Sequence, residues 1–548
     1  MTKRSRIASI LLLSVVLRVF VYAQTPAPAA PKTLAELQTR ISDILAKPEL
    51  APAMVGVKVV SLDTGKVLFE ENAAKLLRPA SNMKLYTVAA ALDKLTPDYH
   101  FTTSVYAAKR PDSSGVVHGD LTIYGRGDPT FATRFNNGDY FKGVNDLAAR
   151  IAAAGVKRVE GDLVGDETYF VGPKYGSGWE WEDLTWYYGA EISPLTINDN
   201  ALDLFIKPGA ALGQPAVITT GPPDPLLTIV NKVTTSAKGL KRQFNIHRGL
   251  GENTVTIAGT IPLEDPGYTG AVSISHPGLL FIYLLRSALT QKGVVITGKS
   301  RTTGTVNQPP LLPDPAAVAS QTTSQTASQA ASQTAPIEIT TMDSPPFGII
   351  AAQTLKPSQN LYTELILRTL GKLTPPPATL PPIRQTSEEL GIEAVKSFLR
   401  TAGIRPESLV LSDGSGLSRS DMITAEATVQ LLTFMSKHRY GEVFRTALPI
   451  AGVDGTLRNR MRGTAAENNV RAKTGSLSSA ASLGGYVTTA AGEKLAFAII
   501  VNNYGSEIEP RVVCIDPIAV MLASFNVKSE MQSTSGTKPP EKTVPQLR

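Results

Sequence analysis

Cysteine and histidine are scarce in this chain of 548 residues. Its one cysteine, Cys514, cannot form an internal disulfide bond, and its apolar neighbours are typical of a small core residue rather than a nucleophile. Its five histidines are scattered, with no HxxxH or HxH pair. Because zinc sites need a cluster of such ligands, we expect no metal site and no cofactor.

A strong excess of one charge is also missing. The formal net charge is +7, but residues 1–23 supply four basic side chains and no acidic one. Without them, 50 basic side chains face 47 acidic ones, which leaves a net charge of only +3. The chain has no dense run of lysine and arginine either. The composition therefore argues against nucleic acid as a partner.

Only the start of the chain contains an apolar stretch long enough to suggest a signal peptide or a membrane-spanning helix. Residues 7–23 are mostly apolar, follow three basic residues, and end in a triplet that fits the rule for signal-peptide cleavage before Gln24. Arg18 interrupts the apolar run, which argues against a permanent membrane span. We expect a signal peptide over 1–23, export to the periplasm or the exterior, and at most peripheral membrane contact. An uncleaved anchor helix is the alternative.

The remaining sequence alternates between helical, β-like and low-complexity patterns. Apolar residues recur at helical spacing over 34–44 and 82–95, and Ala481 to Asn502 has the pattern of a β-hairpin. Between about 103 and 305, short β-like runs are separated by Gly, Pro and Asp turns. Residues 306–345 are rich in Ala, Ser, Gln, Thr and Pro, which cannot bury a core.

These patterns predict a chain of several parts. The predicted parts after the signal peptide are a linker over 24–32, one discontinuous domain over 33–104 and 346–525, inserted β-rich domains over 105–305 (the second nested at about 200–262), a low-complexity linker over 306–345, and a disordered tail over 526–548.

A possible nucleophile and base stand at the predicted start of the second helix, in Ser81-Asn82-Met83-Lys84. Positions i and i+3 lie on the same helix face, so the Lys84 amine can reach the Ser81 oxygen. To act as a base near pH 7, this lysine needs its pKa lowered from about 10.4 by burial or by a second cation. Alone the motif is weak, because about two SxxK matches arise by chance in a chain of this length. The alternative is a capped helix with a surface lysine.

Two further motifs lie far along the chain. Ser358-Gln359-Asn360 precedes a helix that we predict over 361–370 and expect Gly371 to end, although Ser358 alone would also suit an ordinary helix cap. Lys473-Thr474-Gly475, followed by Ser476, lies just before the predicted hairpin. A cation and a hydroxyl there can hold a substrate carboxylate, and a glycine leaves room for a substrate backbone.

SxxK, SxN and KTG in this order are the signature set of penicillin-binding proteins and serine β-lactamases. At these residues the sequence resembles the D-alanyl-D-alanine carboxypeptidase/endopeptidase family of class C penicillin-binding proteins, and the likeness spans roughly 35–525. The long gap between Ser81 and Ser358 fits that family, which inserts two extra domains there. Further stretches that resemble it are Arg78-Pro79-Ala80-Ser81, Gly125 to Thr130, Ile197 to Asn200, Ser344-Pro345-Pro346, Asp413 to Ser418 and Ala472 to Ser476.

The resemblance implies a fold and a reaction. The fold is α+β: a penicillin-binding transpeptidase/β-lactamase-like domain, with an antiparallel sheet flanked by helices, that carries two inserted β-rich domains. The implied reaction is that of a serine D-Ala-D-Ala carboxypeptidase or cross-link endopeptidase. Its substrates would be peptidoglycan stem peptides, and β-lactam antibiotics would acylate and inhibit it.

The family's catalytic roles fall on four residues of this sequence. The resemblance implies that Ser81 attacks the carbonyl of the penultimate D-Ala and that Lys84 takes its proton. Ser358 would relay a proton to the leaving amine, and Asn360 would hold Lys84 and bond the substrate amide.

The family's substrate-binding roles fall on the third motif. Lys473 and Thr474 would grip the terminal carboxylate, with Gly475 beside them, and the backbone N–H groups of Ser476 and of the nucleophile would form the oxyanion hole. Asp166, in the inserted region, would help to bind the stem-peptide side chain. The glycines of 414–416 would form a tight loop that supports the site.

Two other functions remain open at this point. A serine β-lactamase would share all three motifs, but the large insertion and the lack of an identifiable deacylating glutamate argue against it. A catalytically inactive cell-wall-binding protein would keep the fold, but it has no need for intact Ser81, Lys84, Ser358 and Lys473. An α/β-hydrolase is disfavoured because no G-x-S-x-G elbow is present.

Overall fold

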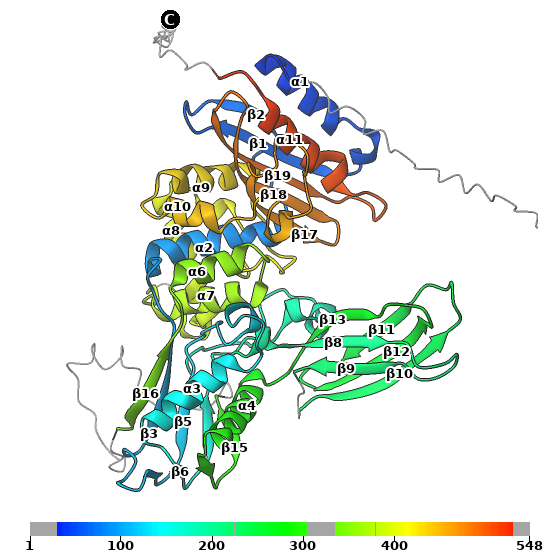
Figure 1. The fold of residues 1–548 in the computed structure, drawn as a ribbon. Helices are drawn as coiled ribbons and strands as arrows, with labels where there is room; N and C mark the ends of the chain where they lie inside the picture. The colour runs from blue at the N-terminus through cyan, green and yellow to red at the C-terminus, as the bar shows by residue number, and fades with distance from the viewer. Residues whose placement is uncertain (1–29, 223–225, 305–334, 379, 530–548) are drawn as a thin grey trace, which may run out of the picture.

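A computed structural model describes residues 30–222, 226–304, 335–378 and 380–529. They form an upper body, a lower body and an arm that extends from the lower body (Figure 1). The upper body contains residues from both ends of the described chain, and the elements from β3 (Thr102–Ala107) to β16 (Ile337–Asp343) belong to the lower body and the arm. The predicted signal peptide, and nearly all of the predicted tail, lie outside the described residues.

The centre of the upper body is a five-stranded antiparallel sheet in the order β17-β18-β19-β1-β2. Its strands are β1 (Met54–Ser61), β2 (Val67–Glu71), β17 (Arg471–Leu477), β18 (Ala480–Thr488) and β19 (Lys494–Asn502). The hairpin predicted over 481–502 is therefore confirmed as β18 and β19. Strands from the start and the end of the chain pair directly, since β1 lies against β19.

Helices cover both faces of this sheet. One face packs against α1 (Leu34–Leu45) and α11 (Asp516–Ser524), in a core that includes the fully buried Cys514, as its apolar neighbours predict. The other face packs on α2 (Met83–Leu95) and a group of helices from the second half of the chain. That group is α6 (Phe347–Leu355), α7 (Asn360–Lys372), α8 (Ser387–Thr401), α9 (Ala425–Lys437) and α10 (Gly441–Ala447).

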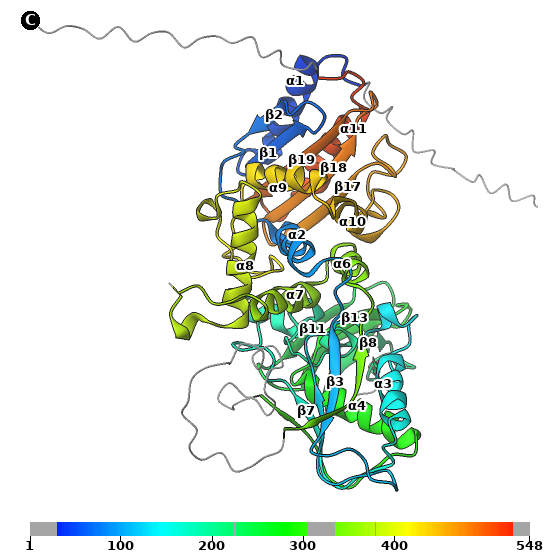
Figure 2. The ribbon, with the colours of Figure 1, turned by 90° about the vertical axis from the view of Figure 1, so that its left-hand side faces the viewer.

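The lower body is a second five-stranded sheet, in the order β15-β7-β5-β3-β16, with two helices. Figure 2 shows it below α6 and α7, which lie at the boundary with the upper body. Its strands are β3 (Thr102–Ala107), β5 (Leu121–Tyr124), β7 (Leu163–Asp166), β15 (Ser300–Thr303) and β16 (Ile337–Asp343), and its helices are α3 (Lys142–Ala153) and α4 (Pro277–Gln291). A small sheet of β4 (Val116–Val117), β6 (Arg158–Val159) and β14 (Val295–Ile296) lies beside them.

The arm consists of two three-stranded sheets with their own small apolar core. Its strands are β8 (Ala201–Lys207), β9 (Val217–Gly221), β10 (Thr228–Ser236), β11 (Gln243–Arg248), β12 (Thr254–Pro262) and β13 (Tyr268–Ser273).

Two sequence expectations were wrong. The predicted linker over 306–345 ends in a strand, because β16 pairs antiparallel with β3 and buries Ile339. Gly371 does not follow the last turn of its helix, because α7 continues to Lys372 and Gly371 is its next-to-last residue. A Cβ atom at Gly371 would lie 2.0 Å from the carbonyl oxygen of Ser387, so the glycine permits the close approach of α8.

Helix α2 begins close to its predicted position, after a short 3-10 helix, η2 (Ala80–Asn82). None of the helices in the described ranges is long and apolar enough to cross a membrane.

Candidate active site

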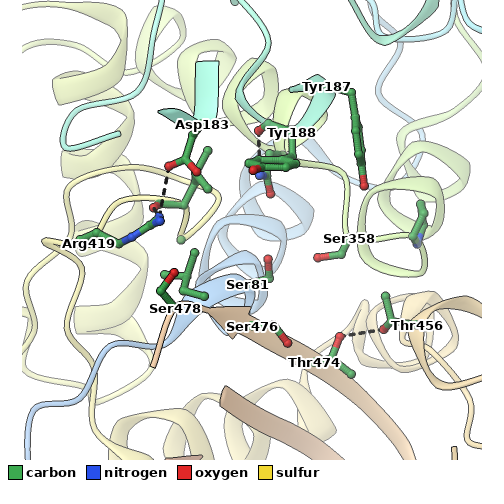
Figure 3. A pocket seen from close by; sticks show the side chains of 15 residues that line it. Ser81, Asp183, Tyr187, Tyr188, Ser358, Arg419, Thr456, Thr474, Ser476 and Ser478 are labelled. Carbon is green, nitrogen blue, oxygen red and sulfur yellow. Dashed lines mark hydrogen bonds and ion pairs between the residues drawn. The ribbon is translucent and has the colours of Figure 1, made fainter. Parts of the chain in front are cut away.

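A pocket of about 410 Å³ opens between the upper and the lower body, and the three predicted motifs meet there. Figure 3 shows the hydroxyl of Ser81 at its centre, with Ser358 to one side and Ser476 below. The full lining is Ser81, Asp183, Tyr187, Tyr188, Pro357, Ser358, Asn360, Gly416, Leu417, Arg419, Thr456, Thr474, Ser476, Leu477 and Ser478. Residues hundreds of positions apart therefore face one space.

The backbone before Ser81 is held in an unusual conformation. Ala80 has a φ of +46°, in the left-handed region that a residue with a side chain rarely adopts. Gly416 lies against it, since a Cβ atom there would be 1.9 Å from the Ala80 carbonyl oxygen. The loop that carries Gly416 thus fixes the segment from which Ser81 projects.

The Lys84 amine touches three oxygens. Its Nζ lies 2.9 Å from Ser81 Oγ, 2.5 Å from Asn360 Oδ1 and 2.7 Å from the carbonyl oxygen of Ser415. A neutral amine has two N–H groups and one lone pair. The two N–H groups can serve the two carbonyl oxygens, which leaves the lone pair directed at the Ser81 hydroxyl. This geometry suits a base that removes the hydroxyl proton.

Burial gives Lys84 the protonation state that a base requires. The side chain is fully buried, and this burial lowers its pKa from 10.5 to about 7. The buried carboxyl groups of Asp413, Glu364 and Asp421 act in the opposite direction and raise the Lys84 pKa. Burial prevails, so a large fraction of the amine is uncharged at neutral pH.

A second lysine, Lys473, is fully buried behind the lining residue Ser358 and does not itself line the pocket. Lys473 Nζ donates to Ser358 Oγ at 2.8 Å and to the carbonyl oxygen of Thr474 at 2.9 Å. Burial, and secondly the charge of Lys84, lower its pKa well below 10.5. A bound carboxylate would supply the missing opposite charge and favour the protonated form.

Asn360 connects the two bodies. It is the first residue of α7, and Gln359 rather than Ser358 caps that helix, by accepting the N–H of Leu361. The Asn360 Nδ2 group donates to the carbonyl oxygen of Tyr188, in the lower body, at 2.9 Å. This bond fixes the amide so that its oxygen faces Lys84.

The remaining residues of the third motif lie on β17. Thr474 Oγ1 donates to Thr456 Oγ1 at 2.8 Å, and Ser476 is exposed in the pocket. A Cβ atom at Gly475 would lie 2.2 Å from Ser482 Oγ and 2.5 Å from the Pro79 carbonyl oxygen. Packing of β17 against the segment before Ser81 therefore requires glycine, a reason different from the substrate contact expected from the sequence.

The glycine loop behind the site is held by buried carboxylates. Asp413 accepts the backbone N–H groups of Gly416 at 2.6 Å and of Leu417 and Ser418 at 3.1 Å. Glu364 Oε1 accepts those of Gly414 and Ser415 at 2.9 Å. The loop presents the Ser415 carbonyl oxygen to Lys84, so it supports the site as the resemblance implies.

Asp166 does not line the pocket. It lies on β7 with no exposed surface, so the expectation that it meets the stem peptide was wrong. The acid that the inserted segment does bring to the pocket is Asp183, which pairs with Arg419 at 3.2 Å (Figure 3). These two residues are 236 positions apart and belong to no local motif, so no sequence pattern marks them as part of the site.

Comparisons with known proteins agree with this architecture. The model of the D-Ala-D-Ala carboxypeptidase 3 (S13) family matches residues 37–325 and 313–524. A D-alanyl-D-alanine carboxypeptidase of Actinomadura sp. (strain R39) is 34% identical over 510 residues, covering 91% of this chain and 86% of the relative. The carboxypeptidase DacB of Haemophilus influenzae is 25% identical over 459 residues, covering 82% and 86%.

The fold has a solved counterpart as well. The crystal structure of penicillin binding protein 4 (dacB) from Haemophilus influenzae superposes with a TM-score of 0.71 at 23% identity, and covers 87% of this chain and 97% of that one. The α+β fold class expected from the sequence is confirmed.

Proposed function

This chain belongs to the D-Ala-D-Ala carboxypeptidase (S13) family and is a serine DD-peptidase, and we propose that Ser81 is its nucleophile and Lys84 its base. One observation carries the assignment of the residues. The buried Lys84 amine has carbonyl partners for both of its N–H groups and lies 2.9 Å from the Ser81 hydroxyl.

The first half of the reaction forms an acyl-enzyme. Lys84 takes the proton of Ser81, whose oxygen attacks the carbonyl carbon of the penultimate D-Ala. The backbone N–H groups of Ser81 and Ser476 receive the oxyanion. When the peptide C–N bond breaks, Ser358 relays to the leaving amine the proton that Lys84 took from Ser81, so Lys84 is neutral again for the second half. Lys473 donates a hydrogen bond to Ser358 and holds its hydroxyl in place.

The second half releases the product. A water molecule gives its proton to the base and attacks the ester carbonyl, and the Ser81 oxygen leaves with a proton returned from Lys84. β-Lactams enter the first half in the same way, since Ser81 opens their strained amide and becomes acylated.

The substrates that suit this pocket are peptidoglycan stem peptides. Thr474, which lines the pocket, and Lys473, which is buried directly behind Ser358, would hold the terminal carboxylate. Asp183, which comes from the lower body, would accept a hydrogen bond from an amine on the stem-peptide side chain. The role once expected of Asp166 would thus fall to Asp183, while Asn360 bonds the backbone amide. The predicted signal peptide would bring the enzyme to this substrate by export.

The experiment that tests this proposal is product analysis. Purified chain is incubated with a stem pentapeptide and, separately, with a cross-linked muropeptide dimer, and the products are identified by mass spectrometry. Release of free D-Ala from the first or of monomers from the second is expected, and neither from Ser81→Ala. Cleavage that persists in Ser81→Ala would refute the assignment of the nucleophile. Rapid turnover of penicillin without peptide cleavage would favour the β-lactamase alternative.

A further inference from the structure

A second pocket, of about 510 Å³, lies on the upper body and shares no residue with the active site. It opens where the connection between α9 and α10 meets the ends of β17, β18 and β19. Its charged lining is strongly unbalanced. Four cationic side chains, Arg439, Arg445, Arg471 and Lys494, face one acidic side chain, Glu442.

Two of these cations already have partners. Arg445 donates to the Glu442 carboxylate through Nε at 2.9 Å and through Nη2 at 2.7 Å. Arg439 donates to the backbone oxygen of Asp93 at 3.3 Å and lies 3.8 Å from the Asp93 carboxylate. The other two do not, because no carboxylate in the described part of the chain lies within 4.0 Å of the side-chain nitrogens of Arg471 or Lys494. The pocket thus holds two unmatched positive charges.

Strand register directs both unmatched charges into the same cleft. Arg471 pairs with Tyr486 across β17 and β18, and Lys494 pairs with Thr488 across β18 and β19. Since side chains two positions apart lie on the same face of a strand, Tyr486 and Thr488 share a face, and their partners share it too. The charge of Arg471 also reaches Glu442, whose pKa it helps to lower after the larger effect of Arg445.

The pocket also has an apolar component. Tyr486 has its hydroxyl engaged with the Leu432 carbonyl oxygen at 2.8 Å, and only 8% of the residue is exposed. Its ring and the half-buried side chain of Leu62 therefore offer the pocket apolar surface. The cavity is also larger than one small inorganic anion needs.

We propose that this pocket binds an organic phosphate: a phosphate group held by Arg471 and Lys494, with a small apolar or aromatic body against Tyr486 and Leu62. Arginine pairs with phosphate through two parallel hydrogen bonds, and a doubly charged anion matches two free cations better than a single carboxylate does. The phosphate could belong to a free metabolite or to a polymer. The assignment does not depend on the peptidase reaction.

Phenyl phosphate is the probe for this site, titrated calorimetrically into the purified full chain. One saturable site is expected, with inorganic phosphate and phenol each at least about tenfold weaker. Lys494→Gln and Arg471→Gln should each lower the affinity for phenyl phosphate by about tenfold or more. Lys238→Gln, at an exposed lysine on the arm, should leave this affinity unchanged. Prior acylation with benzylpenicillin should leave binding unchanged, because it blocks only the active site.

Several results would overturn the proposal. Binding that is equal in Lys494→Gln and wild type, or that penicillin abolishes, would place the phosphate elsewhere. If inorganic phosphate bound as tightly as phenyl phosphate, the proposed contact of an apolar body with Tyr486 and Leu62 would be refuted. Each variant is accepted only if its penicillin acylation rate and unfolding temperature match those of wild type, and Lys494→Gln, at an exposed position, suffices if Arg471→Gln fails to fold. The affinities for a phosphodiester oligomer and for phenyl phosphate are also compared. Tighter binding of the oligomer indicates a phosphate within a polymer, and tighter binding of phenyl phosphate indicates a free metabolite.

Discussion

Replacing Asn360 by aspartate tests whether Lys84 is the base, because it places a negative charge where a neutral oxygen now lies 2.5 Å from the amine. At that distance and an effective dielectric constant of about 20, the attraction is roughly 7 kcal/mol. Burying the new carboxylate consumes part of this, so we expect the Lys84 pKa to rise by at least about two, from about 7 to about 9.

The effect on rate follows from the fraction of neutral lysine. At pH 7 that fraction falls from about one half to about one hundredth, so acylation should slow by about 50-fold, and most of the loss should disappear near pH 10. The assay is the second-order rate constant of acylation by a fluorescent penicillin between pH 5.5 and 10. Asn360→Ala is the control, since it removes the hydrogen bond without adding charge. A loss in Asn360→Asp that is equal at every pH would refute the role of Lys84 as the titrating base.

Three further predictions concern stability and substrate choice. Lys84→Met should be inactive, yet its free energy of unfolding at pH 7 should exceed that of wild type by a few kcal/mol. Because the pKa of Lys84 is lowered in the folded state, wild-type stability rises between pH 7 and 10, so the difference in thermal unfolding temperature between the two proteins should narrow over that range. A difference that stays constant with pH would contradict the low pKa of Lys84. Gly371→Ala should destabilise the protein by about 1–3 kcal/mol in denaturant unfolding, because its Cβ would collide with the Ser387 carbonyl oxygen. The control Gly505→Ala, where a Cβ meets nothing within 4 Å, should leave stability nearly unchanged. Equal effects of the two substitutions would show that α7 and α8 can separate freely. Asp183→Asn should lower kcat/KM by about tenfold for a stem peptide with a free side-chain amine and leave the acetylated peptide unaffected; equal losses on both would rule out the amine contact.

Local sequence patterns predicted the helices and strands that are determined by interactions between residues close in the sequence. Helix α1 follows from apolar spacing and from Thr33, whose side chain accepts the N–H of Glu36. The β18–β19 hairpin follows from two apolar runs around a turn. The three motifs were found because each is a short run of residues with a defined chemistry.

Features that depend on distant contacts were not predictable in this way. Strand β16 exists because β3, which lies about 240 residues earlier, offers it an edge, as the Thr102–Asp343 hydrogen bond across 241 positions illustrates. Glycine commonly ends a helix, so the sequence predicted that role for Gly371. Only the packing of α8 explains why a glycine is needed at this position. Asp183 reaches the pocket through the fold of the lower body. Even Lys84 and Asn360, 276 positions apart, were paired only by the family resemblance.

The most direct measurement is the site of penicillin attachment. Intact mass spectrometry after brief exposure to benzylpenicillin should show one equivalent added to the wild-type chain, and peptide mapping should place it on Ser81. Ser81→Ala should remain at its unmodified mass. An adduct mapped to another residue, or one that survives in Ser81→Ala, would contradict the account.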